Sequence, residues 1–351
     1  MTIYWNVNPE AADPQAIREA AGMLRAGQTV AFPTETVYGL GADARSSEAV
    51  QRIFTAKGRP SDNPLIVHIA HRSQLDELAS SEDETVSRLI ETFWPGPLTI
   101  VLPLKPGALS PLVTAGLDTV GVRMPDHPVA LALLEAAGCP VAAPSANRSG
   151  RPSPTRAEHV REDLAGRIGG LVDGGPTGVG LESTVVAVAP GEVHVLRPGG
   201  VTSAQLREAV PGAAIIDAAG EAKPDEAPRS PGMKYTHYAP QGRMLIVQGT
   251  PEAAAARIRQ ELAAARAAGE RTGVLAFTED APQFAGDADC IVEWGGRHDA
   301  FELARRLYDA LRRFDEEGVD FIAAQHVPDE GLGEAIMNRL RKAAGNRIVH
   351  V

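Results

Sequence analysis

The strongest constraint on the fold is a break in composition between residues 217 and 240. Alanine, glutamate, lysine and proline dominate this segment, and the apolar spacing seen on either side is absent until Tyr235 and Tyr238. The chain has 351 residues, and a single core usually stops growing at roughly 250–300. We therefore expect two domains, over 1–216 and 241–351, joined by a linker over 217–240.

The part before the break is expected to be mixed α/β. Helical spacing over 14–26 predicts a helix that Gly27 would end, and the apolar run 29–32 predicts the next strand. Further short, β-branched runs bounded by proline or glycine alternate with helical patterns. The predicted strands are 64–70, 98–104, 141–143 and 184–188, and the predicted helices are 82–93 and 129–137.

The part after the break alternates strands and helices regularly. Strands are predicted at 244–247, 273–277, 290–294 and 321–324, with helices at 251–269 and 300–317. This order implies a small, parallel, doubly wound sheet. No Gly-x-Gly-x-x-Gly follows its first strand, so we assign it no dinucleotide.

Charge and cysteine content exclude several classes of function. With 45 Asp and Glu against 34 Lys and Arg, the net charge of -11 disfavours broad attraction to nucleic acid or anionic lipid. Cys139 and Cys290 are isolated, which argues against a disulfide framework, a zinc ribbon or a redox motif. Without an apolar leader or a long apolar run, we expect a soluble, cytoplasmic protein with no membrane contact.

Two pairs of residues are candidates for binding phosphate. Lys57 and Arg59 lie on a turn flanked by glycine and proline, from which an ammonium and a guanidinium can reach neighbouring phosphate oxygens. Two solvated cations at a helix end are an alternative. Ser145 and Asn147 follow an apolar run and supply neutral donors where a strand edge commonly meets ligand, although a plain turn also fits.

Other polar residues allow two interpretations each. His68 lies within an apolar run, which favours a core histidine over a site residue. Arg123, between apolar neighbours, needs a carboxylate, either a structural aspartate or an amino-acid ligand. The segment 182–184 ends a glycine-rich loop or enters a strand, and Arg197 holds a nucleotide or sits on a turn.

Taken together, these motifs resemble the signature of the YrdC-like threonylcarbamoyl-AMP synthases. The resemblance is carried by Lys57-x-Arg59 and Ser145-x-Asn147 with the Pro-Thr-Glu-Thr-Val-Tyr-Gly segment 33–39. It extends through 94–99, 182–185 and 196–200, and 230–240 is similar to the linker of the long form with a C-terminal Sua-type domain. The resemblance implies a YrdC-like twisted mixed sheet with helices, followed by a smaller Rossmann-like domain.

The resemblance also implies a reaction. L-Threonine, bicarbonate and ATP, the last with Mg²⁺, would give threonylcarbamoyl-AMP and pyrophosphate. The product would pass to a tRNA-modifying threonylcarbamoyl transferase complex that acts on adenosine beside the anticodon. Direct contact of this chain with tRNA is expected to be weak at most.

Residue roles carry over from the same resemblance. The catalytic group would be Lys57, Arg59, Ser145 and Asn147. ATP would be bound by these four and by Asn63, Thr119, Ser153, Arg197, Tyr235 and Tyr238. L-Threonine would be bound by Thr36, His68, Ala143, Ser183 and Arg123, with Arg123 taking its carboxylate. No residue is assigned to a metal, and the linker 217–240 would be a lid over the site.

Two other functions are compatible with this fold. A non-enzymatic RNA-binding module would need a basic stripe and stacking aromatics, whereas this acidic chain has 5% aromatic residues. A carbamoyl-transferring hydrogenase-maturation protein would need zinc-binding cysteine pairs, which two isolated cysteines do not supply. The synthase is therefore the preferred interpretation.

Overall fold

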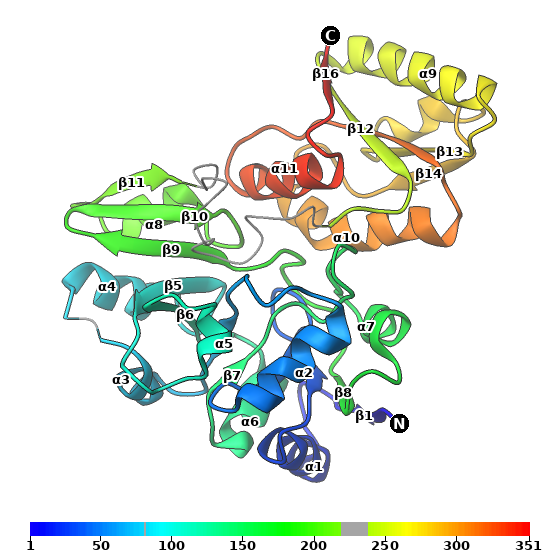
Figure 1. Ribbon diagram of the computed structural model, residues 1–351. Helices are drawn as coiled ribbons and strands as arrows, with labels where there is room; N and C mark the ends of the chain where they lie inside the picture. Colours follow the sequence, from blue (N-terminus) through cyan, green and yellow to red (C-terminus); the bar gives the residue numbers. More distant parts are fainter. Residues whose placement is uncertain (81, 219–237) are drawn as a thin grey trace. The chain divides into compact units, whose positions relative to one another are not determined.

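The computed structural model describes residues 1–80, 82–218 and 238–351 (Figure 1). The chain divides into two compact units, one of residues 1–149 and 153–235, the other of 150–152 and 236–351. Most of the predicted linker lies outside the described residues, so its boundaries at 217 and 240 stay predictions.

The first unit is built on an eleven-stranded mixed sheet with the strand order β1-β8-β2-β3-β7-β4-β6-β5-β9-β10-β11. Its elements are β1 (Ile3–Asn6), α1 (Pro14–Arg25), β2 (Val30–Phe32), β3 (Gly39–Asp43), α2 (Ser47–Lys57), β4 (Ile66–His68), η1 (Arg72–Gln74), α3 (Leu75–Leu78), α4 (Glu84–Phe93), β5 (Leu98–Pro103), α5 (Pro111–Thr114), β6 (Thr119–Arg123), α6 (Pro128–Ala137), β7 (Val141–Ala142), α7 (Ala157–Leu164), β8 (Gly170–Asp173), β9 (Thr184–Ala189), β10 (Glu192–Arg197), α8 (Ser203–Ala209) and β11 (Ala214–Asp217). The mixed α/β prediction is confirmed.

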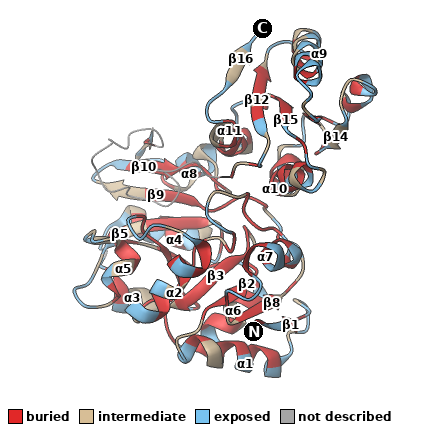
Figure 2. Ribbon diagram, turned by 45° about the vertical axis from the view of Figure 1, so that its right-hand side comes forward, coloured by how far each residue is buried: buried red, intermediate tan, exposed pale blue. Residues whose placement is uncertain are grey.

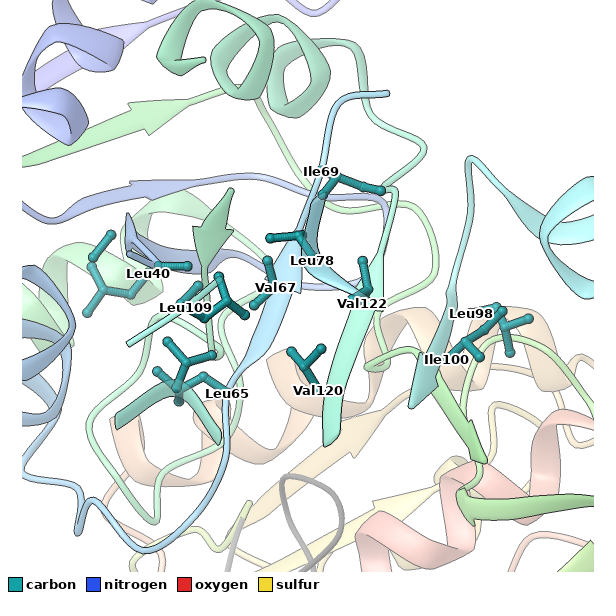
Figure 3. Packing of buried hydrophobic residues seen from close by; sticks show 14 of the residues in the cluster. Leu40, Leu65, Val67, Ile69, Leu78, Leu98, Ile100, Leu109, Val120 and Val122 are labelled. Carbon is teal, nitrogen blue, oxygen red and sulfur yellow. The ribbon is translucent and has the colours of Figure 1, made fainter. Parts of the chain in front are cut away.

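The main core of this unit covers one face of the central strands. Val67, Ile100, Val120 and Val122 pack together there (Figure 3) and are fully or almost fully buried. The same cluster takes apolar side chains from α2, α4 and α7, and most of the central strands are buried (Figure 2). Because strand side chains alternate, the residues between these apolar positions point to the opposite face.

Helix α2, which was not predicted, places the first candidate phosphate residue. Ser46 caps its N-terminus, and Lys57 is its last residue. Gly58 follows in the left-handed region, with φ 63°, where glycine is least strained. The turn expected at 57–60 is therefore the exit from a helix.

The second unit contains a five-stranded sheet with the order β14-β13-β15-β12-β16, and every pairing recorded in it is parallel. Its elements are β12 (Arg243–Gln248), α9 (Pro251–Ala267), β13 (Thr272–Ala276), η2 (Ala281–Phe284), β14 (Cys290–Glu293), α10 (Ala300–Glu316), β15 (Phe321–Gln325), α11 (Leu332–Ala343) and β16 (Ile348–His350). The predicted parallel sheet is confirmed, whereas α11 and β16 were not predicted. Within the described ranges, no helix is both long and apolar enough to span a bilayer.

The buried face predicts a specific stability cost. Ile100 is fully buried whereas Ile3 is 47% exposed, so Ile100→Ala should lower the free energy of unfolding by about 3 kcal/mol and Ile3→Ala by less than about 0.5 kcal/mol. Urea unfolding would be followed by tryptophan fluorescence in a Trp294→Phe background, which leaves Trp5 and Trp94, both in the first unit. Equal losses for both variants would contradict the assigned core.

Candidate functional site

A row of polar side chains crosses the sheet face opposite the main core. His68 on β4 pairs in register with Arg123 on β6. Val122 pairs with Ile100, so Arg123 lies beside Thr99 on β5 if the register continues. The Thr99 hydroxyl is 2.7 Å from the hydroxyl of Ser183, which leads into β9. His68 on β4, Arg123 on β6 and Ser183 just before β9, which are all predicted for the amino-acid pocket, thus come to one face.

Arg123 is the centre of this row. Its side chain is buried, Nη1 donates to Thr36 Oγ1 at 2.9 Å, and Nε donates to the carbonyl of Gly96 at 3.2 Å. The third contact is an ion pair between Nη2 and Glu35. The protein therefore supplies a carboxylate to Arg123 itself, from a glutamate, where the sequence had left open a structural aspartate or an amino-acid ligand.

The glycine-rich loop, residues 169–180, holds Glu35 and Thr36, which both contact Arg123. The amide of Val179 donates to the carbonyl of Glu35 at 2.7 Å, and that of Gly180 donates to the carbonyl of Thr36 at 3.1 Å. Thr36 Oγ1 also lies 2.8 Å from Thr34 Oγ1. Both backbone and side-chain contacts thus fix Glu35 and Thr36 beside the guanidinium.

His68 is kept uncharged by its surroundings. Burial, and to a lesser degree the Arg123 guanidinium, lowers the pKa of His68 to about 3. Its Nδ1 is buried and has no hydrogen-bond partner among the described residues. A neutral imidazole with one unused nitrogen beside Arg123 suits a ligand hydroxyl.

The remaining residues predicted for L-threonine have most of their polar groups engaged. The Ala143 amide donates to the carbonyl of Ile66 at 2.9 Å. Arg197 Nη2 donates to the Ser183 carbonyl at 2.8 Å and to its hydroxyl at 3.2 Å. A residue predicted for ATP therefore contacts a residue predicted for the amino acid.

A second group forms around Lys57. Its Nζ donates to the carbonyls of Ser145 at 2.5 Å and Asn147 at 2.6 Å, and it lies 3.3 Å from Asn147 Oδ1. The Ser145 hydroxyl donates to the same Oδ1 at 2.6 Å. Burial, and next the charge of Arg59, lowers the pKa of Lys57 well below its usual range. All four residues predicted as catalytic are thus connected by contact or by charge, and Lys57 braces the 145–147 loop.

Arg59 and Asn63 are brought together at the start of the following loop. Arg59 Nη2 donates to the carbonyls of Asn63 at 3.3 Å and Pro64 at 3.2 Å. The Asn63 side chain is fully buried, and neither its Oδ1 nor its Nδ2 has a hydrogen-bond partner in the described part of the chain. An unsatisfied buried amide normally indicates a ligand, a water or a change of conformation.

Ser153 and Thr119 lie in the same unit. The Ser153 hydroxyl donates to Glu182 Oε1 at 2.5 Å, and both residues are buried. Thr119 begins β6 and, by alternation, shares the face of Arg123. Gly199 packs so closely that a Cβ would lie 2.3 Å from the carbonyl oxygen of Glu182, which explains a glycine after Arg197.

The role predicted for the two tyrosines, covering the nucleotide, stays a prediction. Tyr235 lies outside the described residues, as does most of the predicted lid. Tyr238 belongs to the second unit, where its ring centroid is 5.4 Å from that of Tyr308.

Sequence reasoning missed Glu35 and Thr99 as members of the site. Glu35 belongs to the 33–39 segment that carries the resemblance, but no local sequence feature marks it as the partner of Arg123. The available signal was the buried arginine itself, because it requires a carboxylate partner.

The low pKa of His68 predicts a dependence of stability on pH. A histidine neutral when folded becomes protonated on unfolding below about pH 6.5, so stability is lost as pH falls through that value toward 3. Between pH 7 and pH 5 the loss from this residue should be about 2 kcal/mol, and His68→Asn should remove it. Urea unfolding of both proteins at the two pH values measures this, and the same pH dependence in both would contradict a buried, neutral His68.

Comparison with protein families defines the class of protein. The family model Sua5_yciO_yrdC, described as "Telomere recombination", matches residues 22–199. The model described as "Threonylcarbamoyl-AMP synthase, C-terminal domain" matches residues 201–345. The chain thus contains a YrdC-like domain followed by a Sua5 C-terminal domain.

Individual relatives match along the whole chain. The threonylcarbamoyl-AMP synthase of Bacillus subtilis is 56% identical, with 96% of this chain and 95% of the relative covered. That of Pyrococcus abyssi is 47% identical over the full length of both. The crystal structure of P. abyssi Sua5 complexed with L-threonine matches with a TM-score of 0.92 and 46% identity, covering 100% of each chain. The chain belongs to the threonylcarbamoyl-AMP synthase family, which confirms the resemblance and favours the synthase over an RNA-binding module.

Proposed function

We propose that this protein makes threonylcarbamoyl-AMP and pyrophosphate from L-threonine, bicarbonate and ATP. The observation that carries the proposal is the contact of Arg197 with Ser183, because a residue predicted for ATP there touches a residue predicted for L-threonine. The names of the relatives and the L-threonine bound to P. abyssi Sua5 support the same reaction. The product would serve threonylcarbamoyl modification of tRNA adenosine beside the anticodon, through a transferase complex in the cytoplasm.

The amino-acid half of the site would recognise threonine by its two ends. Arg123 has a planar guanidinium fixed by Thr36 and Gly96, which suits a carboxylate. The unused Nδ1 of neutral His68 would bond the substrate hydroxyl. A site built to bond a hydroxyl can reject the isostere valine by ~10⁴, because its own polar groups are then left unpaired.

The nucleotide half would act mainly by positioning and charge. The carbamate must attack the α-phosphorus in line, and such a reaction depends on orientation and charge neutralisation. Lys57, Arg59 and Arg197 would face the phosphates, with Asn63 and the 145–147 loop placing the rest of ATP. Lys57 would exchange a loop carbonyl for a phosphate oxygen, so the loop and the nucleotide would be ordered together.

Mg²⁺ is proposed to enter with ATP. The residues proposed for the nucleotide are cations and neutral donors, which fit a metal bound through phosphate oxygens and water. Bound there, Mg²⁺ would neutralise charge on the phosphates.

The reaction is tested by pyrophosphate release from ATP and Mg²⁺ with and without L-threonine and bicarbonate. Release should require both, and L-valine should not replace L-threonine. Lys57→Met should reduce the rate by ~10² or more, as loss of one preorganised charge commonly does, whereas exposed Lys105→Met should not. Release without threonine, or none from folded wild type that binds ATP, would overturn the proposal.

The role of Arg123 separates the two substrates. Arg123→Lys keeps a charge for Glu35 but loses the planar pair of donors. Calorimetry should show threonine affinity at least ~10-fold weaker and ATP affinity unchanged, with exposed Arg88→Lys on α4 as the matched control. Equal weakening of ATP and threonine would exclude Arg123 as the carboxylate ligand.

A further inference from the structure

The ion pair of Arg123 and Glu35 sets opposite charges side by side at the amino-acid half of the site. A free amino acid at neutral pH carries the same two charges, a carboxylate and an α-ammonium. The carboxylate matches Arg123, and the ammonium matches Glu35. The pair is thus complementary to a zwitterion and not merely to an anion.

Glu35 has carboxylate capacity that the protein does not use. Its side chain is only 11% exposed, and apart from Arg123 its two oxygens have no hydrogen-bond partner among the described residues. Its backbone carbonyl is bonded to Val179, so the residue is held in place. Buried carboxylate oxygens without donors are costly, and an ammonium would satisfy them.

Glu35, His68 and His127 are the candidate proton acceptors near Arg123, and Glu35 is the one in direct contact with it. His68 is neutral and lies in register with Arg123. Burial lowers the pKa of His127, with Glu35 acting in the opposite direction. His127 Nδ1 also has no partner within the described ranges, so His127 is the competing base.

We propose that Glu35 binds the α-ammonium of the substrate amino acid and then accepts its proton, an inference that rests on the proposed function. In that step an N–H bond of the ammonium breaks and an O–H bond forms on Glu35, giving a neutral amine and a neutral carboxyl group. The amine lone pair then attacks the carbon of bicarbonate, and the carbamate anion and one water are formed. Neutral Glu35 no longer repels the new negative charge.

The ion pair gives this scheme a charge balance before and after binding. Without substrate, Glu35 neutralises Arg123. With substrate, the incoming carboxylate takes Arg123, and Glu35 is released to the ammonium. Neither buried charge is left without a partner at any stage, which would otherwise be strongly destabilising.

The binding role is tested with an analogue that lacks only the ammonium. 3-Hydroxybutanoate keeps the carboxylate and the hydroxyl, so wild type should bind L-threonine at least ~10-fold more tightly than it, as a charge-assisted hydrogen bond predicts. Glu35→Gln should remove most of that difference, because threonine loses the partner of its ammonium and 3-hydroxybutanoate no longer leaves a buried Glu35 carboxylate unpaired. Exposed Glu91→Gln is the matched control.

Equal wild-type affinities for the two ligands would overturn the proposal without any variant. A full preference for threonine in folded Glu35→Gln would overturn it as well. If Glu35→Gln fails to fold, Glu35→Asp is the second variant. It keeps the charge and should keep part of the wild-type preference for threonine.

The proton-accepting role is tested by the pH profile of pyrophosphate release. In Glu35→Gln the free amine must come from solution, so kcat/KM for threonine should rise up to tenfold per pH unit below the amine pKa, more steeply than in wild type. Arg123, His68 and His127 face this region, and His127→Gln should keep the shallow wild-type profile. A steep profile in His127→Gln instead of Glu35→Gln would assign the base to His127 and overturn the proposal.

The two proposals fail in different ways. Wild type that is inactive with all substrates would count against the proposed function. Active wild type with a contrary binding result or a contrary pH profile would count against Glu35 alone.

Discussion

The buried guanidinium of Arg123 is the constraint on which the site depends. Removing an arginine and a glutamate from water costs several kcal/mol per ion, and their attraction rarely exceeds that cost by much. Replacing a buried ion pair by well-packed apolar residues is often neutral or stabilising. The pair is better explained by ligand recognition than by stability, because it places both charges that an amino acid requires side by side.

Strand alternation makes such a charged site compatible with a stable core. Val120 and Val122 point into the main cluster (Figure 3), whereas Arg123 lies on the other face of the same strand. Loops supply the other site residues. The glycine-rich loop holds Glu35 of segment 33–39 in place, and Lys57 bonds the carbonyls of loop 145–147. The hydrophobic face fixes the sheet, and the sheet fixes the spacing of the polar row.

Periodicity and turn signals predicted the fold class of both units and part of their helices and strands. The helix at 14–26 is α1, and the alternation after residue 240 is the parallel sheet of the second unit. Many of the residues selected by the resemblance lie in two groups in the first unit, whereas Tyr238 belongs to the second unit and Tyr235 lies outside the described residues. Local pattern could not predict that Glu35 pairs with Arg123 or that Lys57 donates to loop carbonyls, because such contacts join segments far apart in sequence and depend on the sheet register. Helix α11 and β16 were missed because the alternation was followed only to residue 324.

The most direct test of this account is a crystal structure of the protein with L-threonine bound. The account predicts the threonine carboxylate on the Arg123 guanidinium and the α-ammonium at a Glu35 oxygen, each at about 3 Å. Threonine bound with its carboxylate away from Arg123, or with Arg123 and Glu35 still paired and the ammonium on other groups, would contradict it.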